Sequence, residues 1–84
     1  MIPQQPMSLE DARIHFPPMW TVYDHPKDYP LHFVVRLWYG PVVDREAILC
    51  DTLAAARQYI SEQGGCVPLA RDARDDPVVV ETWL

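Results

Sequence analysis

Glycine and cysteine are scarce in this 84-residue chain, and each shortage excludes a class of site. The three glycines, Gly40, Gly64 and Gly65, fit no phosphate-binding loop pattern. The two cysteines, Cys50 and Cys66, form neither a Cys-x-x-Cys pair nor a set spaced for a metal ion. We therefore expect no cofactor and no metal.

Positive charge is also in short supply. Seven Lys and Arg stand against twelve Asp and Glu, for a net charge of -5. This balance argues against direct binding to nucleic acid or to anionic membranes, and it leaves a basic protein partner open.

Long apolar runs are missing. No segment is long enough to span a bilayer, and the first residues lack the basic and apolar regions of a signal peptide. We expect a soluble cytoplasmic protein whose thiols are reduced, with a disulfide as the less favoured alternative. Both cysteines stand in apolar runs, which indicates buried, unreactive thiols.

Apolar residues nevertheless make up 49% of the chain, enough for one core. We expect a single domain over residues 19–84, preceded by an N-terminal extension over residues 1–18. Within the extension, Ser8 followed by Asp11 resembles a capping box, and a double proline comes after it. The pattern predicts a short helix over Leu9 to His15.

Period-two alternation predicts the strands. The clearest runs from His32 to Tyr39 and turns Phe33, Val35 and Leu37, together with Tyr39, to the core. A second strong strand is expected over Val78 to Leu84, and weaker strands over Met19 to Tyr23 and Cys66 to Ala70. Pro68 cannot donate to a ladder, so its strand should lie at an edge.

The main helix is predicted over Leu53 to Gln63, with Asp51 or Thr52 as N-cap and Gly64 as the stop. Glu46 to Cys50 stays open between strand and helix. The element order predicts an α+β fold, in which one main helix covers one face of a small, mainly antiparallel sheet of three to five strands.

Two sets of side chains are candidates for a site. The first is Arg36, Trp38, Glu81 and Trp83, which would line one sheet surface if their two strands are neighbours. Trp and Arg are frequent hot spots of protein interfaces, so this set predicts an interaction face. The alternative is that the N-terminal segment folds over that face and buries it.

The second set is Asp24, His25, Asp28 and His32, whose side chains suit acid–base chemistry. The structural interpretation is favoured, because Tyr-Asp-His-Pro and Lys-Asp-Tyr-Pro each place an Asp two residues before a Pro. Asp side chains bond nearby backbone N–H groups and Pro presets the turn. The stretch is then a stiff connection between strands.

A charged segment precedes the last predicted strand. Asp72, Asp75 and Asp76 offer ligands to a hard cation, but Arg71 and Arg74 compete for the same carboxylates. A solvated loop is the favoured interpretation.

The chain from Trp20 to Leu84 resembles a group of small bacterial and phage-associated proteins. Their pattern of W-x-V-Y, P-x-D-Y-P and F-V-x-R-x-W is matched here by Trp20, Val22, Tyr23, Pro26, Asp28, Tyr29, Pro30, Phe33, Val34, Arg36 and Trp38. The ending D-D-P-x-x-x-E-x-W is matched as well. The group is uncharacterised, so the resemblance implies a single cytoplasmic domain and transfers no catalytic residue.

The sequence thus predicts a non-enzymatic protein-binding module. Self-association as a homodimer is one form of this hypothesis, and a phage-type inhibitor of a host protein is another. The alternative is a small enzyme that uses the Asp/His cluster between Asp24 and His32.

Overall fold

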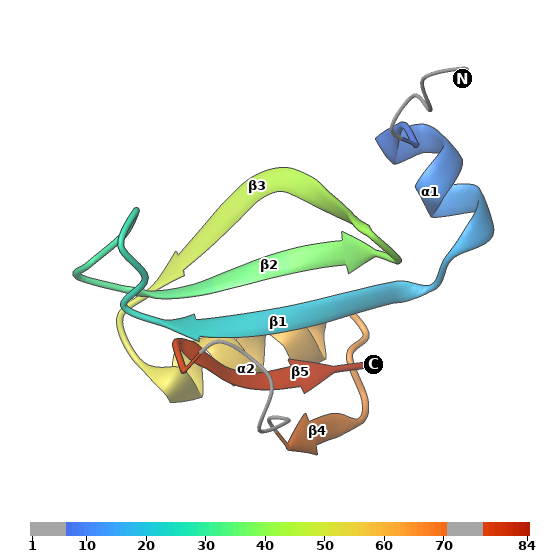
Figure 1. The fold of residues 1–84 in the computed structure, drawn as a ribbon. Coiled ribbons are helices and arrows are strands. Elements are labelled where there is room, and N and C mark those ends of the chain that lie inside the picture. Colours follow the sequence, from blue (N-terminus) through green and yellow to red (C-terminus); the bar gives the residue numbers. More distant parts are fainter. Residues whose placement is uncertain (1–6, 71–76) are drawn as a thin grey trace.

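A computed structural model describes residues 7–70 and 77–84 and confirms the predicted α+β fold. Its elements are α1 (Leu9–His15), β1 (Pro18–Asp24), β2 (Phe33–Tyr39), β3 (Val42–Cys50), α2 (Leu53–Glu62), β4 (Pro68–Ala70) and β5 (Val79–Trp83). The strands form one antiparallel sheet in the order β3-β2-β1-β5-β4, and α2 lies behind β1 and β5 in the view of Figure 1. The expected edge position of β4 is confirmed. The charged segment with Asp72, Asp75 and Asp76 lies outside the described residues.

The segment that the sequence left open is part of a strand. β3 has nine residues, begins directly after the two-residue turn at Gly40 and Pro41, and pairs with β2 on both sides of an irregularity opposite Leu37. Gly40 has a φ of +57°, and a Cβ atom there would lie 2.6 Å from the ring of Phe16. Only glycine satisfies both conditions without strain, so this residue fixes where β2 turns into β3.

The main helix begins and ends close to the predicted positions. The Thr52 hydroxyl accepts a hydrogen bond from the Ala55 N–H at 3.1 Å, so Thr52 rather than Asp51 is the N-cap. At the other end Gly64 has a φ of +103°, and the Gly65 N–H donates to the Ile60 carbonyl at 2.9 Å. This pair of features is a Schellman motif, which satisfies carbonyls that the helix leaves free.

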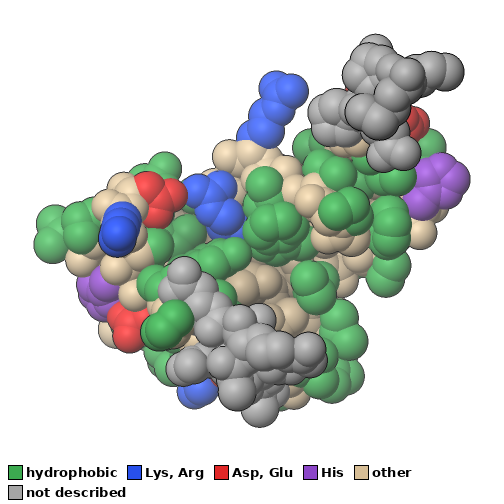
Figure 2. Space-filling view, in the orientation of Figure 1, with side chains coloured by type: hydrophobic (Ala, Val, Ile, Leu, Met, Phe, Trp, Pro, Cys, Tyr) green, Lys and Arg blue, Asp and Glu red, His purple; other side chains and the backbone are tan. Residues whose placement is uncertain are grey.

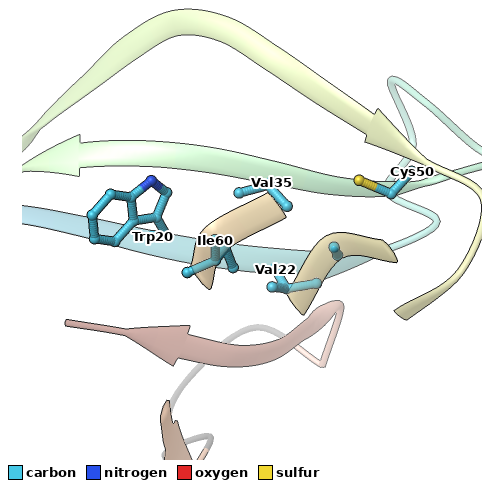
Figure 3. Packing of buried hydrophobic residues seen from close by; sticks show 6 residues of the cluster. Trp20, Val22, Val35, Cys50 and Ile60 are labelled. Carbon is cyan, nitrogen blue, oxygen red and sulfur yellow. The ribbon is translucent and has the colours of Figure 1, made fainter. Parts of the chain in front are cut away.

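The core lies between α2 and the sheet. Figure 3 shows the side chains of Trp20, Val22 and Val35 gathered around Ile60 of α2, with Cys50 at one end. On α2, Ala56 and Ile60 are fully buried, and Leu53 and Tyr59 pack beside them.

The short helix α1 packs against the ends of β2 and β3, next to the turn at Gly40 (Figure 1). Ala12 is fully buried there, and Arg13 forms an ion pair with Asp44 at 3.1 Å. The guanidinium carbon of Arg13 also lies 5.7 Å from the centre of the Tyr39 ring. The Ser8 hydroxyl caps the helix by accepting from the Asp11 N–H, as the sequence predicts.

Candidate functional site

The side of the sheet opposite α2, which we call the outer face, is largely apolar. The pairing register places on it the strand residues Met19, Thr21, Tyr23, Val34, Arg36, Trp38, Val43, Ala47, Leu49, Leu69, Val79 and Thr82. Arg36 is the one charged member of this set. The exposed face of an antiparallel sheet is normally polar. Figure 2, drawn from this side, shows hydrophobic side chains gathered over the sheet. The outer face is therefore more apolar than the solvent-exposed face of an antiparallel sheet usually is.

Large apolar side chains remain exposed at the margins of this face. Leu49 on β3 is 45% exposed and Leu69 on β4 is 42% exposed. Val67 and Leu84 exchange two backbone hydrogen bonds, so their side chains share a face. Since Trp83 faces α2, alternation turns Leu84, and Val67 with it, to the outer face. The apolar surface therefore extends across the sheet from β3 to the chain end beyond β5.

A groove of about 280 Å³ runs along this face. It is lined by Tyr23, Pro26, Asp28, Val34, Arg36, Trp38, Val43 and Val78. These side chains come from β1, β2, β3, the 25–32 connection and the residue before β5. Residues 7–18 contribute nothing to the lining, so within the described residues the alternative of burial by the N-terminal segment does not hold.

The charge in the groove is a single ion pair. The Arg36 Nη2 donates to Asp28 Oδ2 at 3.2 Å, and the Arg36 side chain is 25% exposed. Arginine has five N–H donors in a rigid fork, and one of them makes this contact. The groove is therefore electrically balanced and keeps further N–H donors for an incoming acceptor.

The four predicted interface residues do not share one surface. Arg36 and Trp38 lie on the outer face, whereas Glu81 and Trp83 lie on the face that packs against α2. The prediction of a shared surface is therefore wrong, and Glu81 accepts two hydrogen bonds from Arg57 of α2, at 2.8 and 3.2 Å. The indole N–H of Trp83 is buried and makes no hydrogen bond of regular geometry among the described residues, but it lies close enough to Glu81 to help lower the pKa of that carboxyl.

Two features of the sheet explain this error. β1 lies between β2 and β5, so the two strong strands are not neighbours. In addition, Val22 pairs with Glu81 and Tyr23 with Val79, which leaves Val80 as an extra residue. Such a bulge breaks the period-two alternation that the sequence argument assumed.

The four residues of the alternative polar set separate into three pairs. Asp24 Oδ1 is in close contact with Nδ1 of its neighbour His25, and both side chains are substantially exposed. Asp28 pairs with Arg36, and His32 Nε2 lies 3.9 Å from Asp51 Oδ1. The set does not converge on one point, and only Asp28 lines the outer groove.

The 25–32 segment is a connection between β1 and β2, as the structural interpretation held, but its closure has a different cause. The His25 N–H donates to the His32 carbonyl at 3.0 Å, and the Tyr29 N–H donates to the Pro26 carbonyl. Both Asp side chains bond side chains rather than backbone N–H groups. The predicted role of these carboxylates in holding the backbone is therefore wrong.

A second, much smaller cavity lies on the α2 side. It has a volume of about 40 Å³ and is lined by Trp20, Val35, Leu37, Asp44, Glu46, Ile48 and Tyr59. Burial raises the pKa of Tyr59, and the charges of Glu46 and Asp44 raise it further. The Glu46 backbone N–H holds the pKa of Asp44 below its usual value, assisted by Arg13. A cavity of this size has room for a few water molecules.

The cysteines differ in their surroundings. Both thiols are free; Cys50 is buried, and burial raises its pKa. Cys66 is exposed, so the prediction of a buried thiol is wrong at this position. Within residues 7–70 and 77–84, no group of three or more His, Cys, Asp or Glu is arranged to hold a metal ion. In the same residues no helix has the length and apolar character needed to cross a membrane.

The sequence did not indicate two apolar residues of the outer face on β3. Val43, which lines the groove, lies in residues 42–45, to which no strand was assigned, and Leu49 lies in the segment Glu46 to Cys50 that stayed open between strand and helix. A two-residue Gly-Pro turn after a strand was the available signal. It sets Tyr39 opposite Val42 and so places Val43 beside Trp38.

No protein-family model, curated protein sequence or solved structure shows a significant match to this chain. The resemblance to small bacterial and phage-associated proteins stays a prediction.

Proposed function

We propose that this protein is a non-enzymatic binding module that docks another polypeptide on the outer face. The observation that carries the proposal is the groove between Tyr23, Arg36 and Trp38, set in a sheet face whose margins keep apolar side chains in water. Exposed apolar area of this kind is typical of interaction sites.

The contents of the groove suit binding better than catalysis. An aromatic anchor and an arginine with unused donors are the side chains most often found at the centre of protein interfaces. The Asp24–His25 pair offers an acid–base dyad, but it lies outside the residues that line the groove. The enzyme hypothesis therefore rests on an exposed pair of side chains that does not line the groove.

Affinity capture with matched variants tests the proposal. The tagged protein is exposed to a cell lysate supplemented with untagged chain, and the retained polypeptides are identified by mass spectrometry. We expect Trp38→Ala and Arg36→Ala to lose the retained polypeptide, whereas His25→Ala and His32→Ala keep it. Circular dichroism confirms that each variant is folded.

The result that contradicts the proposal is retention that is indifferent to Trp38 and Arg36, or that depends on either histidine. A host protein captured through Trp38 would support the phage-type inhibitor form of the hypothesis. Capture of the untagged chain alone would support self-association.

A further inference from the structure

We infer that the polypeptide docked on the outer face is a second copy of this chain, and that the two sheets stack face to face about a two-fold axis. This inference rests on the proposed function and specifies its partner. It follows from the composition of the face, its charge, its area and the condition of the sheet edges.

The composition is that of a homodimer interface. Such interfaces are more apolar than those between proteins that also exist apart, and charged residues are depleted at their centre. Among the outer-face positions that the strand pairing fixes, only Arg36 is charged, and Asp28 neutralises it at 3.2 Å. Arg45, an exposed residue in the irregular part of β3, adds one charge at the margin, beside α1. Val34 and Trp38 flank Arg36 on the same strand.

Among the described strands, the acidic side chains lie away from the outer face, so the net charge of -5 is not concentrated on the surface that would be in contact. Glu81 faces α2 and bonds Arg57, and Asp44 and Glu46 line the small cavity on the α2 side. Asp24 lies at the end of β1, beside His25. Two outer faces can therefore meet without bringing acidic side chains of the described strands together, and Arg45 stands at the margin of the face.

The area is sufficient. At about 3.3 Å by about 4.8 Å for each strand residue, the outer face of the five strands covers about 500 Å². Two such faces bury about 1,000 Å², the lower bound for a specific interface, and micromolar affinity is expected at this size. Antiparallel sheets stack in this way about 10 Å apart, with their strands nearly aligned.

The competing arrangement is a dimer that pairs through the edge strands, β3 and β4. Both edge strands have features that disfavour the addition of another strand. The β3 edge is interrupted by an irregularity opposite Leu37, where Asp44, Arg45 and Glu46 occur in sequence. The β4 edge has three residues and begins with Pro68. Bulges, charges and proline protect strand edges from addition of another strand, so association through the face is favoured.

The test measures the molar mass of the full chain by light scattering or sedimentation at about 1 to 100 μM, the range expected for an interface of this size. We expect the mass to rise with concentration from 9.7 kDa towards twice that value. Leu49→Arg and Leu84→Arg, which place charge on the outer face, should weaken the dimer at least about tenfold, because an unpaired charge would be buried.

Leu31→Arg and Ile14→Arg are the matched controls. Their side chains are 80% and 78% exposed and lie on the 25–32 connection and on α1. We expect both controls to dimerise as the unaltered chain does. Amide exchange of the dimer should show no added protection along the free edge of β3.

A chain of 9.7 kDa at every concentration overturns the inference, and so does a dimer that Leu49→Arg and Leu84→Arg leave unchanged. Added protection along β3 would assign the dimer to an edge contact and overturn it as well. If the protein is a monomer but still captures another protein in a way that Trp38→Ala abolishes, only this inference is contradicted. If capture is unchanged in Trp38→Ala and Arg36→Ala, the proposed function is contradicted as well.

Discussion

Glu81 shows how a single residue depends on a partner that is distant in sequence. Its side chain is 12% exposed, and both carboxylate oxygens accept hydrogen bonds from Arg57 on α2. Arg57 holds the pKa of Glu81 below its usual value of 4.5. A lowered pKa means that the pair stabilises the fold above pH 4.5 and that this contribution is lost as the pH falls through the lowered value.

Arg57→Gln should therefore destabilise the protein at pH 7 and have little effect in acid. We expect a measurable loss in the free energy of unfolding at neutral pH, since the Glu81 carboxylate stays largely buried without its partner, and only a modest one, since the guanidinium is half exposed. Urea unfolding at pH 7 and at pH 3 measures the difference. Arg45→Gln, at an exposed position, is the control. An equal loss at both pH values would show that the ion pair is not its source.

The two thiols should report their different environments. We expect a thiol reagent at pH 8 to modify the exposed Cys66 rapidly in the native protein, and to modify Cys50 only as the chain unfolds, because burial raises the pKa of that thiol. Mass spectrometry of the labelled peptides over time separates the two. Simultaneous labelling in the native state would mean that Cys50 is not protected by the core.

Among the elements, α2 carries the inner half of the core, and its ends are fixed by local chemistry. Thr52 begins the helix and the Schellman motif at Gly64 ends it. Ala56 and Ile60 are fully buried against the sheet, so any displacement of the helix start also moves core side chains. The capping residue therefore affects the stability of the whole domain.

Thr52→Ala should destabilise the protein by about 1 kcal/mol, because the Ala55 N–H loses its acceptor. Thr52→Ser keeps an oxygen at the same place and should differ little from the unaltered chain. Thermal and urea unfolding of the two variants provide the comparison. If Ser and Ala behave alike, the hydroxyl is not the stabilising group.

The strands show where period-two alternation correctly predicts which side chains face the core and where it does not. It placed Phe33, Val35 and Leu37 on the core side correctly, because β2 keeps its period there. It failed on β5, where Val80 is inserted as a bulge and Glu81 and Trp83 turn to α2. A bulge is set by the pairing with β1, and no local sequence pattern announces it.

For the whole molecule, two properties act in opposite directions on association. The net charge of -5 makes two copies repel at long range, whereas the outer face favours contact at short range. Salt screens the long-range repulsion between copies. It hardly alters the short-range contact of the outer faces, since the charge in the groove is already paired.

Raising the salt concentration from about 20 mM to about 150 mM, which shortens the Debye length to about 8 Å, should therefore tighten the dimer. Sedimentation equilibrium at the two salt concentrations gives the dissociation constants. A dimer weakened by salt would instead indicate an interface between opposite charges, in conflict with the apolar outer face.

The sequence by itself determined the two helices and the positions of every strand except β3, because these depend on neighbours along the chain. Ser8, Thr52 and Gly64 mark the helices where the structure has them, and the double proline separates α1 from β1. Only the tertiary structure decided which side chains meet. β1 lies between the two strong strands, and the bulge at Val80 turns the side chains of Glu81 and Trp83 to the α2 side of the sheet. Glu81 therefore bonds Arg57 and does not share a surface with Arg36. Strand order and register depend on pairing between segments distant in sequence and on burial. Neither can be read from the alternation of side chains or from the strand propensity of a single segment.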